Sequence, residues 1–527
     1  MGACMTSGRF RVLAGLLLCM SPMAQAAAPA DRAPADAASA DPAVADAGPA
    51  RAPATEQSRG VDRVLTIAGQ AIHYRATAGT LTLHSDEGEP VASMFYVAYT
   101  AAAPRGGAER PVTFFFNGGP GSASLWLNIG GFGPQRAATA TPHATPPAPY
   151  TFVSNESSLL DRTDLVFLDA IGTGYSRALG SAGPDRFWGV DGDVDAFARA
   201  ILRYCEINQR WNSPKFLFGE SYGTTRAAAL AYRLHIRDVD LNGVILLSSI
   251  LNFARLQPGA DQQYIDLLPS YAAAARFHQR ASDAGADEVA FLKDARTFAS
   301  GPYAAALAKG DRLPADEEAA VVRETARFTG LSEPYLRRAH LRVDMEDFRK
   351  ELLSGQGRVI GRFDARFSGP SVSPGGHFDP ATNDPATAGV NGAYFAAFRD
   401  ELAKIGYVTG LDYRPLYNAV IEPRWDMHHK APGIDEALTT PNTGFDLAAT
   451  MGANPALRIL SLNGLYDLST PFFGTEFDLA HLMLPPALQA NISVRYYATG
   501  HQLYADPDAL RAAKRDLDAF YDAALRR

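Results

Sequence analysis

The chain has 527 residues, of which 47% are hydrophobic and 20% are charged, and its formal net charge is −8. This length and apolar content suffice for one large globular core with an inserted subdomain, and they argue against disorder over most of the chain. The negative balance gives no reason to expect nucleic acid or an anionic membrane surface as a partner.

The N-terminal segment, residues 1–26, is typical of a secretion signal. Arg9 and Arg11 precede an apolar stretch at residues 12–20, and small residues suited to cleavage follow. The apolar stretch is too short for a membrane-spanning helix. Residues 27–58 are rich in Ala, Pro and Asp, which predicts a disordered segment. We therefore expect a periplasmic or secreted protein.

Only one cysteine lies beyond the predicted signal, namely Cys205. A single cysteine cannot form an internal disulfide. It follows an apparent helix, and we expect it to be a small buried hydrophobic residue.

Strand-like runs between residues 60 and 100 are separated by turn residues, which predicts an antiparallel entry to a sheet. They lie at residues 64–67, 71–75, 79–83 and 92–99. Further along the chain, apolar strands alternate with helical segments. This alternation predicts a mainly parallel sheet with helices on both faces, that is, an α/β fold.

A glycine-rich loop, residues 117–124, follows an apolar strand at residues 111–116. Such a loop after an early strand can supply part of an oxyanion hole. A simple tight turn is the alternative interpretation. A phosphate-binding loop is disfavoured, because no Gly-Lys-Ser/Thr sequence follows.

The most informative motif is Gly-Glu-Ser-Tyr-Gly at residues 219–223. It lies between a predicted strand at residues 215–218 and a predicted helix at residues 224–231. A Gly-x-Ser-x-Gly in that setting is the nucleophile elbow of the α/β-hydrolase fold. Ser221 is therefore the candidate nucleophile.

Residues 252–387 change in character, because helical spacing dominates there. We predict an inserted helical cap, with the alternative that these helices merely extend the core. The helices are expected at residues 271–280, 286–298, 315–327 and 333–353.

The candidate acid and base follow two later strands. Asp467 comes just after the strand at residues 458–464, and His501 comes just after the strand at residues 492–497. The chain order serine, acid, histidine is that of the α/β-hydrolase fold. We interpret His428 and His429 as part of a polar loop and expect no metal ion and no cofactor.

Four motifs, at residues 117–121, 219–223, 467–471 and 500–501, together resemble the serine carboxypeptidase family and its bacterial members in particular. The resemblance covers roughly residues 90–250 and 385–505. It implies an α/β-hydrolase core in two parts, at residues 59–251 and 388–527, around the cap. It also implies an enzyme that releases C-terminal residues from peptides through an acyl-enzyme. The absence of a disulfide favours a bacterial member.

The resemblance implies a role for each matching residue. Burial is expected to keep Glu220 protonated, so that it does not repel a substrate carboxylate. Its alternative role is to brace the elbow by hydrogen bonds. The implied triad is Ser221, Asp467 and His501, the implied oxyanion hole is formed by the amides of Gly119 and Tyr222, and the implied ligands of the substrate carboxylate are Asn117 and Glu220.

One position departs from the family pattern. Many eukaryotic members carry a second glutamate in a Glu-x-Gly-Pro run, where this chain has Gly131. Arg136 offers a compensating charge, although an exposed arginine is the simpler interpretation. The departure bears on exopeptidase specificity more than on hydrolase chemistry.

Two other functions stay open from the sequence. An esterase or acyltransferase would use the same scaffold, because an acyl-enzyme can pass to water, an alcohol or an amine. An inactive binding protein would keep the pocket without turnover. The sequence indicates neither the oligomeric state nor the side-chain preference.

Overall fold

The structure is a computed structural model that describes residues 52–102, 109–181, 183–282, 287–372 and 384–526. The predicted signal and most of the predicted disordered segment lie outside these ranges. Residues 52–58 are described, and Glu56 accepts a hydrogen bond from Arg203 at 2.9 Å. The first strand begins at Ser58. Strand pairing thus starts two residues after this ion pair, where Ser58 lies opposite Gly79.

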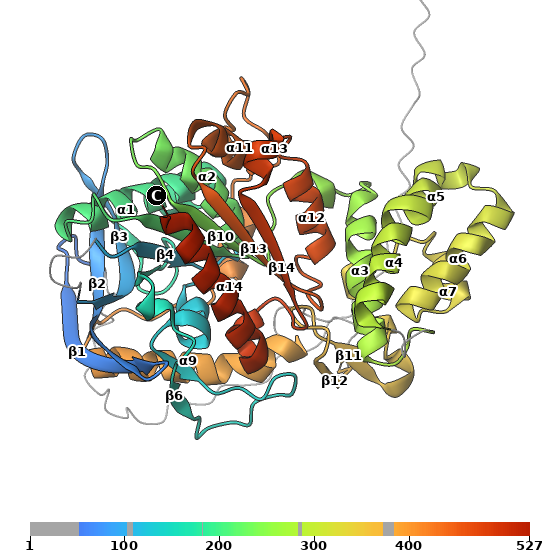
Figure 1. Cartoon of the computed structure of the whole chain (residues 1–527), viewed down its shortest axis with the longest axis horizontal. Helices are drawn as coiled ribbons and strands as arrows, with labels where there is room; N and C mark the ends of the chain where they lie inside the picture. Colours follow the sequence, from blue (N-terminus) through green and yellow to red (C-terminus); the bar gives the residue numbers. More distant parts are fainter. Residues whose placement is uncertain (1–51, 103–108, 182, 283–286, 373–383, 527) are drawn as a thin grey trace, which may run out of the picture. The chain divides into compact units, whose positions relative to one another are not determined.

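A ten-stranded sheet forms the centre of the fold, in the order β1-β2-β3-β7-β4-β9-β10-β13-β14, with β8 paired to β3 (Figure 1). The strands from β7 to β14 along this order run parallel, and β1, β2 and β3 form the antiparallel entry. The strands are β1 (Ser58–Ile67), β2 (Gln70–His84), β3 (Pro90–Ala101), β4 (Val112–Phe116), β7 (Asp164–Leu168), β8 (Arg177–Ala178), β9 (Lys215–Glu220), β10 (Gly243–Leu247), β13 (Arg458–Gly464) and β14 (Ile492–Tyr497).

The predicted strands at residues 71–75 and 79–83 are one strand, β2. Its middle residues, 76–78, pair with β1 on one side and β3 on the other. Hydrogen bonding on both sides keeps this stretch extended, although its small residues give no clear strand signal.

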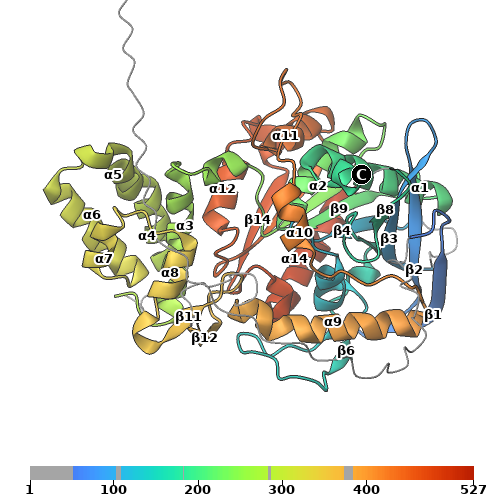
Figure 2. The same cartoon turned by 180° about the vertical axis from the view of Figure 1, so that it is seen from behind.

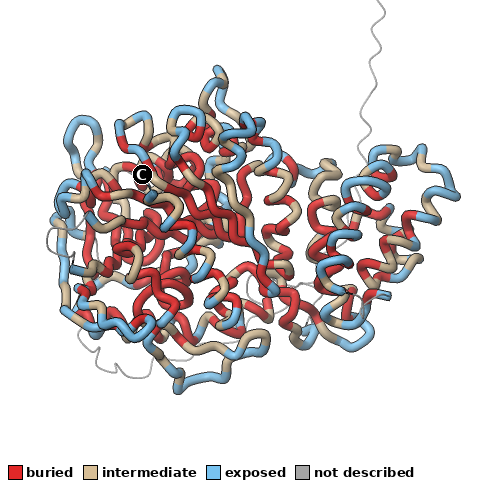
Figure 3. The backbone as a smooth tube through the Cα atoms, viewed as in Figure 1, coloured by how far each residue is buried: buried red, intermediate tan, exposed pale blue. Residues whose placement is uncertain are grey.

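Helices cover both faces of the sheet, as predicted. Phe114 packs with α1 (Val190–Ile207), α2 (Tyr222–His235) and α11 (Gly444–Ala453). Its neighbour Phe115 packs on the opposite face with α9 (Pro385–Ile405) and α14 (Pro507–Leu525). Successive side chains of a strand point to opposite faces, so the parallel strands are buried on both sides. Figure 3 shows this buried centre.

A bundle of helices between β10 and β13 has an apolar cluster of its own, which includes Leu292, Val322 and Phe328. Figures 1 and 2 show it beside the β14 end of the sheet, where α3 packs against α12 (Phe472–Ala480). Its helices are α3 (Gln262–Phe277), α4 (Glu288–Phe298), α5 (Ala304–Lys309), α6 (Ala315–Thr329), α7 (Glu333–Arg338) and α8 (Met345–Glu351).

The predicted helix at residues 333–353 is wrong, because two helices occupy this range. His340 and Leu341 have positive φ angles of 49° and 64°, which end α7. Asp344 then starts α8 as its N-cap, with its carboxylate accepting the Asp347 amide at 2.8 Å.

Shorter elements complete the fold. They include the π-helical turn η1 (Trp126–Phe132), the ribbons β5 (Gln135–Ala137) with β6 (Phe152–Ser154) and β11 (Arg358–Ile360) with β12 (Ser368–Pro370), and the helices α10 (Asn418–Ile421) and α13 (Pro486–Gln489). Cys205 is buried and unpaired, as predicted. Within the described ranges, every helix is too short or too polar to cross a membrane.

Candidate active site

Ser221 occupies a sharp turn between β9 and α2. Its φ of 60° and ψ of −130° place a non-glycine residue in a costly region of conformational space. The flanking glycines are required by close approach. A Cβ on Gly219 would lie 2.1 Å from the Gly223 carbonyl oxygen, and one on Gly223 would lie 2.6 Å from the Phe116 carbonyl oxygen. The geometry is that of a nucleophile elbow.

Asp467 and His501 follow the adjacent parallel strands β13 and β14, which bring them together. His501 Nδ1 lies 2.7 Å from Asp467 Oδ2, and both side chains are buried. Asp467 Oδ1 accepts the amides of Ser469 and Thr470 at 2.8 and 3.0 Å. These bonds fix the carboxylate, so the imidazole has one orientation.

The elbow and the histidine loop are both attached to the end of β10. The Ser221 amide donates to the Leu247 carbonyl at 3.0 Å, and the Ser248 hydroxyl donates to the His501 carbonyl at 2.8 Å. The nucleophile and the pair therefore lie at the same edge of the sheet. Within the described ranges the Ser221 hydroxyl makes no hydrogen bond to His501. Such catalytic bonds often tighten only when substrate binds.

The charges of this cluster favour a protonated imidazole. Burial alone lowers the pKa of His501, but the charge of Asp467, the hydrogen bond to it and the charge of Glu220 outweigh burial and raise the pKa. A raised pKa makes the neutral imidazole a stronger base toward the nucleophile's proton, and the imidazolium that forms then returns that proton to a leaving group.

The glycine-rich loop after β4 lies against the elbow. A Cβ on Gly118 would lie only 2.5 Å from the Tyr222 amide nitrogen, and Gly119 has a φ of +108°. Among the described residues, neither the Gly119 nor the Tyr222 amide donates a hydrogen bond. Two free amides in adjacent segments are suited to bind an oxyanion.

Asn117 and Glu220 contact each other directly. Asn117 Nδ2 donates to Glu220 Oε2 at 2.6 Å, and Asn117 Oδ1 accepts the Leu127 amide at 3.1 Å. The Tyr504 hydroxyl also lies within hydrogen-bond distance of Glu220. Burial raises the pKa of Glu220 to about 7, although His501 and the bonds from Tyr504 and Asn117 act in the opposite direction. The expected rise in this pKa is thus present.

Sequence reasoning missed several residues that hold these loops. The fully buried Arg226 donates to the Asn117 carbonyl at 2.7 Å and to Asp193 at 2.6 Å. The Phe363 carbonyl accepts the His501 amide at 2.6 Å, and the two rings are 5.0 Å apart. An arginine within an alanine-rich predicted helix was a signal in the sequence that could have identified Arg226 as a structural residue. Nothing in the sequence around Phe363 pointed to the histidine.

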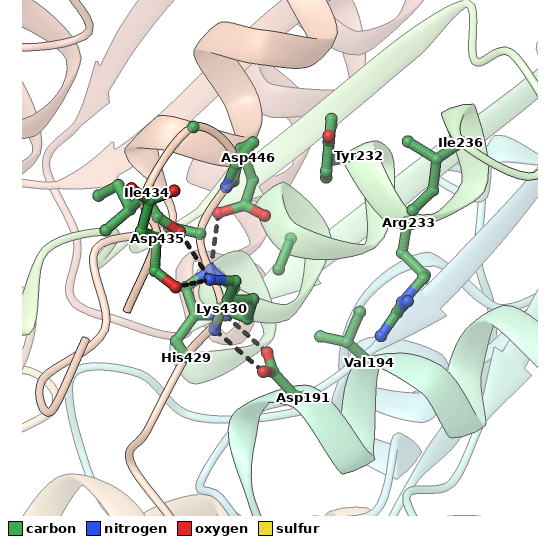
Figure 4. Close-up of a pocket in the computed structure, with 14 residues that line it drawn as sticks. Asp191, Val194, Tyr232, Arg233, Ile236, His429, Lys430, Ile434, Asp435 and Asp446 are labelled. Atoms are coloured by element: carbon green, nitrogen blue, oxygen red, sulfur yellow. Dashed lines mark hydrogen bonds and ion pairs between the residues drawn. The ribbon is translucent and has the colours of Figure 1, made fainter. Parts of the chain in front are cut away.

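Two other interpretations need correction. Arg136 is half-buried rather than exposed, and its guanidinium donates to the Tyr504 carbonyl at 3.3 Å. His429 is buried rather than part of a polar surface loop. Its ring lies between Asp191 at 2.7 Å and Asp446 at 2.8 Å, at a hollow that shares no residue with the predicted site (Figure 4).

Comparisons with known proteins show what this chain is similar to. The family model for serine carboxypeptidase matches residues 69–257. Serine carboxypeptidase-like 46 of Arabidopsis thaliana is 25% identical over 206 residues, which is 37% of this chain and 40% of that protein. The chain thus spans well under half the length of this curated relative.

The fold extends the similarity beyond the matched segment. The crystal structure of Kex1(delta)p, a prohormone-processing carboxypeptidase from Saccharomyces cerevisiae, superposes with a TM-score of 0.52 at 15% identity and covers 85% of this chain and 91% of that chain. The comparisons therefore confirm the predicted α/β-hydrolase fold and the predicted resemblance of this chain to the serine carboxypeptidase family.

Proposed function

We propose that this protein is a serine-type carboxypeptidase that releases C-terminal residues from peptides. The observation that carries the proposal is the pairing of two sites at one sheet edge. The buried Asp467–His501 pair shares this edge with the Ser221 elbow. The hydrogen-bonded Asn117–Glu220 pair lies directly beside the elbow, since Glu220 precedes Ser221 in the chain.

In this mechanism, Ser221 Oγ attacks the last peptide carbonyl while His501 takes the hydroxyl proton. The Gly119 and Tyr222 amides bind the resulting oxyanion. The C–N bond breaks, His501 gives the proton to the leaving amine, and an acyl-enzyme forms. Water, activated by His501, then releases the shortened peptide. Asp467 orients the imidazole throughout.

The Asn117–Glu220 pair would select substrates with a free C-terminus. A protonated Glu220 donates to the substrate carboxylate, and Asn117 Nδ2 supplies a second donor. This role needs the Glu220 proton, and the pKa of about 7 leaves that proton in place in mildly acidic solution. The predicted signal supports export to the periplasm or the medium, and residues 252–387 are proposed as a cap beside the site.

The test is hydrolysis of N-blocked dipeptides with free and amidated C-termini between pH 5 and 8. We expect the free acid to lose its last residue and its amidated twin to be cut poorly. Equal cleavage of both at every pH would exclude the carboxypeptidase proposal and leave an esterase or acyltransferase on the same triad.

A further inference from the structure

A buried tyrosine completes the hydrogen-bond shell of Glu220. The Tyr504 hydroxyl lies 2.8 Å from Oε2 and 3.0 Å from Oε1 of Glu220. The exposed fraction is 2% for Glu220 and 0% for Tyr504, so this bond lies in the protein interior. With Asn117, the carboxyl group has two side-chain donors. This tyrosine lies three residues beyond His501, so a single loop delivers the base and the hydroxyl.

The backbone of η1 is shaped to admit the tyrosine ring. A Cβ on Gly130 would lie 2.8 Å from Tyr504 Cε2, and a Cβ on Gly131 would lie 3.2 Å from Tyr504 Cγ. Two consecutive glycines therefore allow the ring to lie directly against the main chain. Phe132 and Tyr394 pack around the same ring, each with centroids 6.4 Å away. These contacts hold the ring with its hydroxyl at Glu220.

We propose that Tyr504 is a positioning residue for Glu220, and that its hydroxyl sets the upper pH at which a free C-terminal carboxylate is accepted. The inference rests on the proposed function for the role of Glu220, but not for the contact itself. An O–H donor stabilises a carboxylate more than a carboxylic acid. Tyr504 therefore makes Glu220 release its proton at a lower pH than burial alone would dictate.

Other titratable groups of the described residues also face Glu220. His501 and Asp467 lie on the loops after β14 and β13, and they favour and disfavour the carboxylate respectively. Tyr394 on α9 also faces it. Removing the Tyr504 hydroxyl leaves all three in place, so its effect can be isolated.

The experiment compares Tyr504→Phe with the wild type and with Tyr521→Phe. The control loses an equally buried hydroxyl, which pairs with Thr113 at 2.8 Å near the other end of β4. We expect the alkaline limb of peptide kcat/KM to move to higher pH in Tyr504→Phe. The ratio of the rates at pH 8 and pH 6 should rise by up to about tenfold for each pH unit that the limb moves. Ester hydrolysis needs no terminal carboxylate, so it should show no such shift of an alkaline limb, and Tyr521→Phe should follow the wild type.

A second variant and a direct titration make the result decisive. Gly131→Ala keeps the hydroxyl but crowds the ring, and it should shift the limb in the same direction. The protonation of Glu220, followed by infrared difference spectroscopy against Glu220→Gln, should have a higher midpoint in Tyr504→Phe. An unchanged midpoint would overturn the role of Tyr504. A wild type that ignores the free C-terminus would instead overturn the proposed function, while the infrared midpoint would still decide on Tyr504.

Discussion

The hydroxyl of Ser221 is presented by a backbone that few residues adopt, and this geometry is independent of the hydroxyl itself. Ser221→Ala should therefore keep the fold and lower turnover by about 10⁴- to 10⁶-fold, because triad members act as a unit. Covalent labelling by a serine-directed phosphonate, followed by mass spectrometry, checks the assignment. Ser300→Ala, at an exposed serine of the helical bundle, is the matched control. Labelling of another serine in Ser221→Ala would refute the elbow assignment.

Asp467 is held by bonds that distinguish its two oxygens. Oδ1 accepts two backbone amides, while Oδ2 faces His501. In Asp467→Asn the amide oxygen would stay with the backbone donors, and the NH₂ group would face His501 Nδ1. The imidazole would then carry its proton on the wrong nitrogen, and kcat should fall by about 10⁴-fold with stability little changed. A near-normal kcat would place the acid elsewhere. Asp478 is a poor alternative for the acid of the triad, because its carboxylate already pairs with Arg255 at 3.1 Å.

Glu220 connects substrate choice to pH. Its pKa of about 7 means that it carries a proton below pH 7 and loses it above. For peptides, kcat/KM should therefore decline as the pH rises through 7. In Glu220→Gln the decline should disappear, because an amide donates without a titratable proton. Small esters, which have no terminal carboxylate, serve as the control. A pH profile that is identical in Glu220→Gln and the wild type would contradict this role.

The candidate residues that were predicted from sequence share one property, because each lies at the carboxyl end of a strand or within a few residues of it. Chain order and loop position were enough to pair Asp467 with His501. Tyr504 and Phe363 could not be found this way. Their contacts depend on how a buried ring meets two glycines and on where a distant segment passes the histidine.

At the scale of elements, the position of the glycine-rich loop depends on the contact between the end of β4 and the start of α2. Gly118→Ala should separate the two segments, because its Cβ would meet the Tyr222 amide nitrogen at 2.5 Å. We expect kcat to fall by about 10²- to 10³-fold, the loss found when one oxyanion donor is removed. Gly452→Ala in α11 meets nothing within 4 Å and should retain full activity. Unchanged kcat in Gly118→Ala would argue against an oxyanion hole at this contact.

Elements were predictable where local pattern and tertiary context agree. The parallel strands are apolar runs buried on both faces, and they were found. The break between α7 and α8 was missed, because helical spacing continues across residues 339–344 while the backbone turns at His340 and Leu341. The continuity of β2 was missed for the opposite reason, because residues 76–78 carry no strand signal and are extended through pairing on both sides.

At the scale of the whole molecule, His429 joins parts of the chain that are far apart in sequence. Its imidazole is held between Asp191 at the start of α1 and Asp446 in α11. Burial lowers the pKa of His429, but the hydrogen bonds and charges of the two carboxylates outweigh burial and raise it to about 9. The imidazolium therefore fastens the loop before α11 to the sheet-covering helices.

The sign of the resulting pH dependence follows from the raised pKa. Below about pH 6.5 the histidine is protonated in the folded and unfolded states, and its stabilising effect is complete. As the pH rises through about 9, the folded protein loses this proton, and up to about 3 kcal/mol of unfolding free energy is lost with it.

Urea unfolding at pH 6.5 and 9.5 should show this loss in the wild type and a smaller one in His429→Gln. His428→Gln, at the exposed neighbour, should behave like the wild type. Equal losses in His429→Gln and the wild type would mean that the pairing of His429 with Asp191 and Asp446 contributes nothing to the pH dependence of stability.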